Sequence, residues 1–290
     1  MDDRDYQFLL DLYETKNITR VAQKHYLSQP AMTKRMKNIE EELGCQLFLR
    51  SKKGVIFTAD GERIIPHCQS IVRQSHALRN TINQMQGVVG GSLNIYCSFN
   101  YGHYRLPAAL KIFSQRYPLV DINIATGKSK NIYQQFAKRE DCIFIMRGEQ
   151  KWDEGKLLLA TEPICLIYSY ENIGRPLHEY NYIGHQTDAT VEEQIHQWAG
   201  ERNLPLHNTR FWVDDISSCK EMVRCGIGWC ILPKICLEDF EGVVEELSFA
   251  DSTPFTRNTY VLFRESYGQL QQVQLFLKVL QENEECYRKK

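Results

Sequence analysis

The stretch that decides the fold is residues 17–43, NITRVAQKHYLSQPAMTKRMKNIEEEL, which reads as two helices joined by a tight turn. Ser28 is a suitable N-cap for the second helix, and Pro30 falls in its first turn, where its missing N–H does no harm. Apolar side chains then recur every three or four residues, at Met32, Met36, Ile39 and Leu43. The pattern predicts a second helix with one buried stripe along its length.

The opposite face of this second helix carries amide, hydroxyl and ammonium groups, on Gln29, Thr33, Lys34 and Lys37. No Asp or Glu occurs between Lys16 and Lys37. Six cations fall in the same stretch: Lys16, Arg20, Lys24, Lys34, Arg35 and Lys37. Cations bind the phosphate backbone of DNA, and neutral polar groups can read base edges. We therefore expect a DNA-binding helix pair; the alternative is a small helical subdomain with a solvated basic face.

The flanking segments extend this unit on both sides. Residues 4–15 place Phe8, Leu9, Leu12 and Tyr13 on one helical face, which predicts a three-helix core. After Gly44, the predicted C-cap, two β-rich runs at 46–49 and 55–57 enclose a basic turn. This hairpin predicts a wing. Its cations, suited to phosphates or the minor groove, are Arg50, Lys52 and Lys53.

A long helix is expected from Thr58 to residue 89, because apolar or small residues recur at alternating spacings of four and three. This heptad seam contains Ile64, Cys68, Ile71, Ser75, Leu78, Ile82, Met85 and Val89. A narrow stripe over some thirty residues favours pairing with a second copy of the helix over packing within one chain. The expected dimer contacts are Ile64, Ile71, Leu78, Ile82 and Met85. Gly87, Gly90 and Gly91 then mark a domain boundary.

Composition sets bounds on the class of protein. The 290 residues suffice for two or three domains, and the formal net charge of −1 means that attraction to DNA must come from local patches. The start, MDDRDYQF, resembles neither a signal peptide nor a membrane span. The ten cysteines contain no CxxC pair, and we expect reduced, mostly buried thiols in a cytoplasmic protein. A redox-sensing pair remains an alternative for them.

From residue 92 the chain alternates between strand-like and helical runs. The strand-like runs are 93–97, 120–125, 142–146, 164–169, 182–184, 211–213, 229–232 and 259–263. The helical runs are about 104–116, 129–138, 190–200, 216–225 and 268–285. This alternation predicts an α/β fold with mainly parallel sheets. The polar zone near 147–163 and a return near 263–266 suggest two lobes.

The chain resembles the LysR-type transcriptional regulators over its whole length. Residues 22–62, AQKHYLSQPAMTKRMKNIEEELGCQLFLRSKKGVIFTADGE, are close to the family's helix-turn-helix and wing signature. Weaker landmarks of the family's effector domain follow in the right order: GGSLNIYCS, RLPAAL, FSQRYPLVDINI and CGIGWCILP. The resemblance implies a mixed fold: an all-α winged helix-turn-helix domain (residues 1–58), a dimerising linker helix (59–90) and a two-lobed α/β domain similar to periplasmic binding proteins (91–290). Lobe I would take about 91–162 and 265–290, and lobe II about 163–264.

The resemblance also implies function. Such regulators bind promoter DNA as dimers or tetramers, sense a small molecule between the lobes and alter promoter DNA; RNA polymerase is a further expected partner. By position, Gln29, Thr33 and Lys34 resemble recognition-helix contacts, and Arg50 a wing contact. Arg20 and Arg35 depart from the family's usual small residue and polar amide. The complete expected DNA-binding set is Arg20, Ser28, Gln29, Pro30, Thr33, Lys34, Arg35, Lys37, Arg50, Lys52 and Lys53.

The same matching predicts an effector site on loops that follow strands and precede helices. Its expected residues are Ser98, Asn100, Tyr101, Lys128, Ser129, Arg147, Gln186, Thr187 and Asp188. Hydroxyls, amides and helix N-termini suit carboxylates or phosphates, and an Arg can grip a carboxylate in bidentate fashion. We therefore expect a small anionic metabolite. The alternative is that Lys128 and Arg147 are solvated or ion-paired to Asp141 or Asp188.

Catalysis is not expected. The sequence contains no GxSxG, HExxH, P-loop or dinucleotide fingerprint, and its eight histidines are not at metal-ligand spacing. We expect no metal, no cofactor and no membrane partner. A ligand-independent architectural DNA-binding protein is the alternative function, in which the α/β half would serve only oligomerisation.

Overall fold

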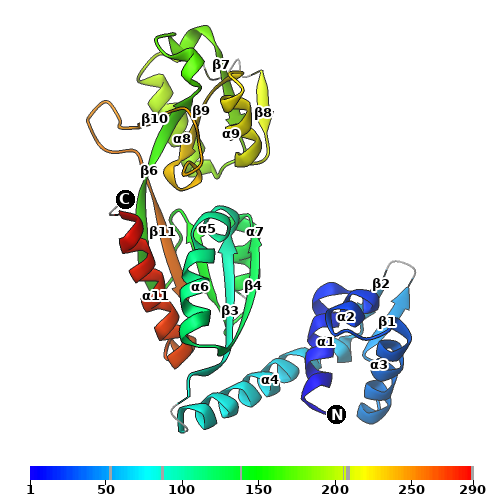
Figure 1. The fold of residues 1–290 in the computed structure, drawn as a ribbon. Coiled ribbons are helices and arrows are strands. Elements are labelled where there is room, and N and C mark those ends of the chain that lie inside the picture. The colour runs from blue at the N-terminus through cyan, green and yellow to red at the C-terminus, as the bar shows by residue number, and fades with distance from the viewer. Residues whose placement is uncertain (52–53, 86–87, 138, 205, 207–209, 289–290) are drawn as a thin grey trace. The chain divides into compact units, whose positions relative to one another are not determined.

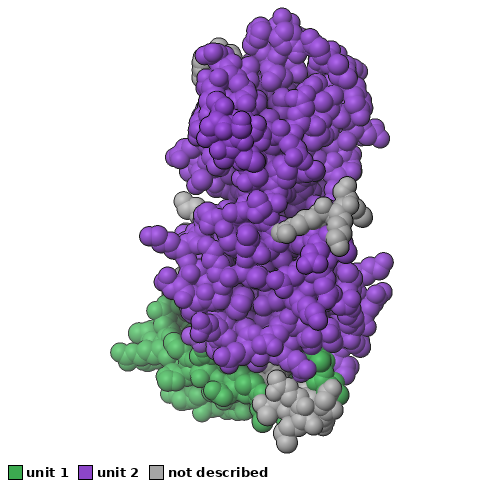
Figure 2. Space-filling model, turned by 90° about the vertical axis from the view of Figure 1, so that its left-hand side faces the viewer, with its two compact units in different colours: residues 1–92 green, residues 93–290 purple. Residues whose placement is uncertain are grey.

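The computed structural model describes residues 1–51, 54–85, 88–137, 139–204, 206 and 210–288. The chain divides into two compact units, Met1–Ser92 and Leu93–Lys290, which Figure 2 distinguishes by colour. Each unit is described by itself. Among the described residues, no helix is long and apolar enough to cross a membrane.

The first unit is a winged helix-turn-helix followed by a long helix (Figure 1). Its elements are α1 (Asp3–Thr15), α2 (Ile18–Lys24), α3 (Gln29–Leu43), β1 (Phe48–Ser51), β2 (Gly54–Phe57) and α4 (Ala59–Met85). The predicted stripe of α3 is fully buried at Met32, Met36 and Ile39. Leu43 was expected in that stripe but is 43% exposed, because it occupies the last turn of α3 at the edge of the core.

The ends of α3 confirm the predicted caps. The Ser28 hydroxyl accepts a hydrogen bond from the Ala31 amide at 3.3 Å, which satisfies a free N–H of the first turn. Gly44 ends the helix in the left-handed conformation, with φ of 69°. The turn before α3 also contains a left-handed residue, Tyr26, whose side chain is exposed.

Arg35 joins α3 to α1. Its Nε and Nη2 atoms each donate to the Asp5 carboxylate at 2.5 Å, and the Asp2 carboxylate lies 3.7 Å away. Asp5 is fully buried, so the guanidinium supplies the counter-charge that this carboxylate needs. The sequence grouped Arg35 with the DNA contacts. In the structure its long side chain turns from α3 toward α1 and pairs with Asp5, so a contact of Arg35 with DNA stays a prediction.

The wing is fixed to the end of α1. Its strands pair antiparallel from Phe48↔Phe57 to Ser51↔Gly54, and the Val55 amide donates to the Lys16 carbonyl at 2.8 Å. A Cβ atom at Gly54 would lie 2.6 Å from the same carbonyl oxygen, and Gly54 has a φ of 126°. Only glycine suits this close approach. Lys52 and Lys53, at the tip, lie outside the described residues.

The long helix α4 begins as predicted and ends earlier. Thr58 caps it, because its hydroxyl accepts from the Gly61 amide at 3.0 Å and donates to the Gln46 carbonyl at 2.8 Å. The first half of the seam packs inside the unit: Cys68 is buried and Ile64 half-buried. Further along, three seam residues are exposed, namely Ile71 (39%), Leu78 (63%) and Ile82 (44%). The helix ends at Met85, whose side chain is outside the described part.

The second unit contains one mixed sheet in the order β4-β3-β5-β11-β6-β9-β7-β8, with β10 paired to β6. Its strands are β3 (Gly90–Ser98), β4 (Leu119–Gly127), β5 (Ile143–Arg147), β6 (Gly155–Tyr168), β7 (Asn181–His185), β8 (Phe211–Val213), β9 (Gly228–Pro233), β10 (Val243–Glu246) and β11 (Thr256–Phe263). The α-helices are α5 (Phe99–Tyr104), α6 (Leu106–Arg116), α7 (Ser129–Phe136), α8 (Ala189–Gly200), α9 (Ile216–Arg224), α10 (Glu265–Gly268) and α11 (Gln271–Arg288). The described residues of this unit also contain three 3-10 helices, η1 (Tyr170–Asn172), η2 (Leu177–Glu179) and η3 (Lys234–Cys236).

Two strands run between two lobes of this unit (Figure 1). In β6, residues 155–163 pair with β11, whereas residues 164–168 pair with β9 and β10. We call the part built around β3, β4, β5 and β11 lobe I, and the part around β7, β8, β9 and β10 lobe II. The sheet is less parallel than predicted, because both crossing strands pair antiparallel with their neighbours.

The sequence missed parts of this arrangement. It treated residues 147–163 as a polar zone between the lobes, although a strand begins at Gly155, and it did not predict β10. It also placed residues 256–264 in lobe II, whereas β11 pairs with β5 over Thr259–Phe263. The physical reason is that β10 and the first half of β6 are partly exposed and polar, so their partners rather than their own hydrophobicity define them. The lobe of β11 is likewise set by its pairing with β5, which its own sequence does not encode.

The exposed seam of α4 generates a first prediction. Ile82→Glu puts a charge on an apolar surface that we expect to pair with a second copy, and each buried isoleucine contributes about 1.5–3 kcal/mol. With two copies affected, sedimentation should show a dimer dissociation constant raised about a hundredfold or more. Gln69→Glu, on the same helix but outside the seam, should leave the dimer dissociation constant unchanged. Equal dissociation constants for the two variants would contradict the prediction that the seam forms the dimer interface.

The Arg35–Asp5 contact generates a second prediction, which concerns the stability of the first unit. Arg35→Met removes the counter-charge of a buried carboxylate and should lower the free energy of unfolding of the first unit by about 2–3 kcal/mol, since the guanidinium is itself partly exposed. Arg35→Lys keeps the charge but loses the bidentate geometry, so its free energy of unfolding should lie between those of the parent protein and Arg35→Met. Urea denaturation followed by circular dichroism measures this. An unchanged midpoint in Arg35→Met would show that the contact does not stabilise the unit.

Candidate functional site

A hydrogen bond joins the exposed polar face of α3 to the first strand of the wing. Gln29, Lys34 and Lys37 are exposed, and Thr33 is half-buried. Gln29 donates through its side-chain amide to the Thr33 hydroxyl at 3.0 Å. The Thr33 carbonyl accepts in turn from Arg50 of β1 at 3.4 Å. The wing cation is therefore held beside the helix face that the sequence singled out.

The remaining residues expected at DNA lie around this face. Ser28 and Pro30 are exposed at the start of α3, and Arg20 is exposed on α2. Lys37 forms an ion pair with Glu41 at 3.3 Å, and both side chains are more than half exposed. Such a pair is weak, so it leaves the ammonium group able to reach a phosphate.

Three cations of the basic stretch serve the fold instead. Arg35 pairs with Asp5, as described above. Lys24 lies 2.7 Å from Asp11, a buried carboxylate that also contacts His25 at 2.5 Å. Lys16 lies 3.7 Å from the centre of the Tyr13 ring, and partial burial lowers its pKa. The basic character of residues 16–37 is thus only partly directed at a ligand.

In lobe I, the first expected effector loop divides between the surface and the core. Ser98 precedes α5 and is 5% exposed, and its hydroxyl has no hydrogen-bond partner among the described residues. Asn100 is half-buried. Tyr101 is fully buried, and its hydroxyl donates to Glu284 of α11 at 2.8 Å; burial raises its pKa. Tyr101 thus faces α11 in this structure, and its expected contact with an effector stays a prediction.

The second expected loop meets lobe II directly. Lys128 precedes α7, and its ammonium group donates to the side-chain carbonyl of Gln186, which follows β7. Two residues assigned to opposite walls of the effector site are therefore in contact. Ser129 begins α7, but its side chain is outside the described part.

Arg147 lies at the end of β5 and is only 4% exposed. It pairs with Glu162 of the crossing strand β6, not with Asp141 or Asp188 as the alternative had it. The second oxygen of Glu162 accepts from the Ile235 amide of η3 in lobe II at 2.9 Å. The Nε atom of Arg147 has no hydrogen-bond partner among the described residues.

A second buried guanidinium, which the sequence analysis missed, lies beside the first. Arg257 of β11 donates to Asp188 at the start of α8 and to the Arg147 carbonyl at 3.3 Å. Burial and the charge of Arg147 lower its pKa, and its Nε atom also lacks a described partner. Asp188 also caps α8 by accepting from the Val191 amide at 3.1 Å, and Thr187 beside it is half-buried. A cation within the strand run TRNTYVLF was the available signal.

Two further ion pairs lie where α5 contacts η3 and the residues after it. Arg105 pairs with Glu238 across the lobes and stacks on Tyr287 of α11, 3.6 Å from the ring centre. Lys220 of α9 pairs with Asp239 at 2.5 Å and lies 5.6 Å from the centre of the Tyr104 ring. These contacts were also missed, because pairing over such sequence separations leaves no local pattern.

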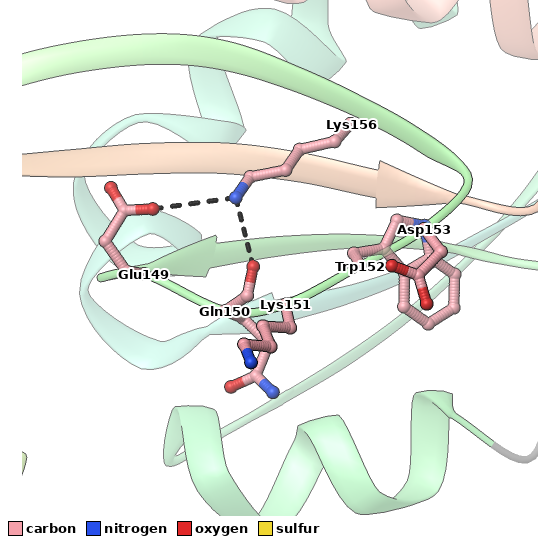
Figure 3. Close-up of a pocket in the computed structure, with 6 residues that line it drawn as sticks. All are labelled: Glu149, Gln150, Lys151, Trp152, Asp153 and Lys156. Carbon is pink, nitrogen blue, oxygen red and sulfur yellow. Dashed lines mark hydrogen bonds and ion pairs between the residues drawn. The ribbon is translucent and has the colours of Figure 1, made fainter.

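A surface hollow lies in the loop between β5 and β6, lined by Glu149, Gln150, Lys151, Trp152, Asp153 and Lys156 (Figure 3). Its central ammonium group is already bound: Lys156 donates to the Gln150 carbonyl at 3.0 Å and lies 3.5 Å from Glu149. Glu149 also accepts from Tyr260 and Asn258. The hollow is distinct from the predicted effector residues. Elsewhere in the described residues, no group of three His, Cys, Asp or Glu side chains is placed to hold a metal ion.

Comparisons with known proteins identify the family of each unit. Residues 4–62 match the family "Bacterial regulatory helix-turn-helix protein, lysR family", and residues 86–285 match the LysR substrate binding domain. The chain is 30% identical over 288 residues to the uncharacterized HTH-type transcriptional regulator YkuM of Bacillus subtilis, covering 97% of each. Among solved structures, a full-length variant of AphB, a regulator known from Vibrio cholerae, is similar with a TM-score of 0.64 and 18% identity, covering 97% of this chain and 98% of that one.

A further solved structure, full-length CbnR in complex with its target DNA, has a TM-score of 0.61 and 16% identity, covering 98% of this chain and 100% of that one. At these identities the structural neighbours support the fold alone. The two family matches together span both units of the chain. The chain belongs to the LysR family of bacterial transcriptional regulators: it is a DNA-binding regulator with an effector-binding substrate domain.

Proposed function

We propose that this regulator binds promoter DNA as a homodimer or homotetramer, and that a small anion bound between the lobes changes its binding or bending of that DNA. RNA polymerase would be a further partner at the promoter, and the bacterial cytoplasm the place of action. The family consists of regulators, and no catalytic role is part of the proposal.

In the proposed DNA-binding surface, neutral polar side chains contact base edges and cationic side chains contact phosphates. Gln29 and Thr33 offer neutral donors and acceptors that suit base edges in the major groove. Lys34, Lys37, Arg50 and Arg20 offer cations for the phosphates, which position the helix. The hydrogen bond from Arg50 to the Thr33 carbonyl supports a shared surface for the two elements.

On the effector side, the proposal is carried by two buried guanidiniums at the junction of the lobes. Arg147 and Arg257 each have an unpartnered Nε among the described residues, and the Ser98 hydroxyl of lobe I likewise lacks a described partner. Unsatisfied buried donors are costly, so a ligand that supplies acceptors would stabilise them. Carboxylate and phosphate groups supply acceptors with the geometry that guanidinium prefers.

The present counter-charges suggest how binding is read out. Glu162 and Asp188 neutralise the two guanidiniums, and Asp188 belongs to lobe II whereas Arg257 belongs to a crossing strand. An anionic effector that replaces Asp188 at Arg257 would release the start of α8, and with it the Gln186 contact to Lys128. A ligand that binds one lobe arrangement better than the other shifts the population between them.

The DNA assignment can be tested by separating base reading from phosphate binding. Thr33→Ala should lose discrimination between base pairs at particular operator positions, by about 1–3 kcal/mol, because a neutral contact to a base edge is lost. Lys34→Ala should weaken binding to operator and random DNA alike and lower the salt slope by about one. Gel shifts over a salt series measure both. Equal losses on operator and random DNA for the two variants would contradict the assignment.

The effector assignment can be tested with a panel of organic acids and their neutral amides. The acids should raise the melting temperature and bind in calorimetry, because ligands that bind only the folded state stabilise it. Arg257→Gln should weaken acid binding about 10–100-fold, the magnitude of a charge-assisted hydrogen bond. Lys111→Gln, an exposed change on α6, is the control.

The outcomes of this experiment separate the alternatives. Binding of neutral compounds but not of acids would contradict the anionic effector while leaving a sensor in place. Retained operator binding with no stabilising ligand in a broad panel would favour the ligand-independent architectural protein.

A further inference from the structure

Lobe II contains two cysteines and a histidine that meet inside its core. Cys219 is on α9, Cys230 is on β9, and His185 is the last residue of β7. Both thiols are fully buried, and His185 is 9% exposed. These positions lie far apart in the sequence, with no CxxC spacing, and only the packing of α9 on β7 and β9 brings them together.

The two thiols belong to one buried cluster between α9, β7 and β9. The Cys219 thiol donates to the Ile183 carbonyl of β7 at 3.7 Å, and the preceding residue of β7, Tyr182, pairs with Trp229, which directly precedes Cys230. The His185 Nδ1 atom is buried and has no hydrogen-bond partner among the described residues. A histidine in the core without a full set of partners needs an explanation beyond packing.

The surroundings favour the thiolate form of Cys219 over that of any neighbouring thiol. Hydrogen bonds from Cys230 and His185 lower the pKa of Cys219, and the first turn of α9, capped by Asp215, places amide N–H groups nearby. In contrast, burial raises the pKa of Cys230. Burial also raises the pKa values of Cys165 and Cys236, in both cases to about 12. Of the two thiols, Cys219 is the one whose surroundings favour the thiolate.

We propose that Cys219 and Cys230 form a reversible disulfide when the protein meets a hydroperoxide, so that lobe II carries a redox input separate from the effector site. Cys219 is the attacking thiol and Cys230 the resolving thiol. His185 is a positioning residue that stabilises the Cys219 thiolate.

The chemistry balances in two steps. The Cys219 thiolate attacks hydrogen peroxide, the simplest hydroperoxide: an S–O bond forms, the O–O bond breaks, and the leaving hydroxide takes a solvent proton to become water. The Cys230 sulfur then attacks the Cys219 sulfenic acid: the S–S bond forms and the S–O bond breaks. The departing hydroxide takes the Cys230 proton and leaves as a second water. The peroxide gains two electrons, and the two thiols lose two.

The position of the pair connects it to the effector loop. His185 directly precedes Gln186, which contacts Lys128, and lies three residues before Asp188, which contacts Arg257. A covalent bond between α9 and β9 would therefore form immediately behind the residues that join the two lobes. The regulator would then have two chemically different signals converging on one loop.

The test is peptide mapping of the reduced full-length protein after graded hydrogen peroxide, quenching and alkylation. We expect a linked Cys219–Cys230 peptide with a mass loss of about 2 Da that dithiothreitol reverses. The exposed Cys225 and Cys286 provide an internal reference for unspecific oxidation. The linked peptide should appear at lower peroxide concentrations than modification of these two.

Three variants sharpen the test. Cys230→Ser should stop the reaction at a Cys219 sulfenic acid, which dimedone traps. Cys165→Ser, a change to another buried thiol of the same cluster, should leave the disulfide unaffected. His185→Asn should slow formation about tenfold, because less of the Cys219 is thiolate. The proposal fails if Cys225 and Cys286 are oxidised while Cys219 and Cys230 remain free thiols in the folded protein.

Discussion

The second unit depends on one constraint. Among the described residues, β6 and β11 are the only strands that extend from one lobe into the other. Backbone hydrogen bonds cross the junction along these two strands, so movement between the lobes has to bend or twist them. The charged residues at the junction are placed by the same strands. Glu162 projects from β6 and Arg257 from β11, and both meet Arg147 at the end of the neighbouring β5. The hinge and the charged cluster are thus one structural feature, and a change in the charges acts where the chain can yield.

How much of this could be predicted from the sequence depended on the range of the interactions. The stripe at Met32, Met36 and Ile39, the Ser28 cap and the long helix α4 follow from spacings within one helix, so periodicity and capping rules were sufficient. The crossing strand β6 was found only in its apolar second half. Its first half alternates between partly buried and exposed residues and pairs with a strand about a hundred residues later, which no local pattern encodes.

Charged side chains show the same limit more sharply. Counting cations identified residues 16–37 as basic, but Arg35 and Lys24 turn to the buried carboxylates Asp5 and Asp11. Arg147 was placed correctly after its strand, yet its partner, Glu162, came from a different strand and not from the two carboxylates considered. A long flexible side chain has several directions open to it, and its choice is made by a carboxylate that is distant in sequence.

The contact between Asp188 and Arg257 means that the proposed effector has a competitor inside the protein. A tethered carboxylate acts at a high effective concentration, on the order of millimolar for short flexible connections, and does not dilute with the solution. A free anion therefore has to exceed a threshold before it displaces Asp188, whatever its intrinsic affinity for the guanidinium. The regulator would ignore trace amounts of its signal and respond when the metabolite accumulates. The set point would lie in the strength of an internal ion pair, which a single substitution near α8 could adjust without altering the binding surface itself.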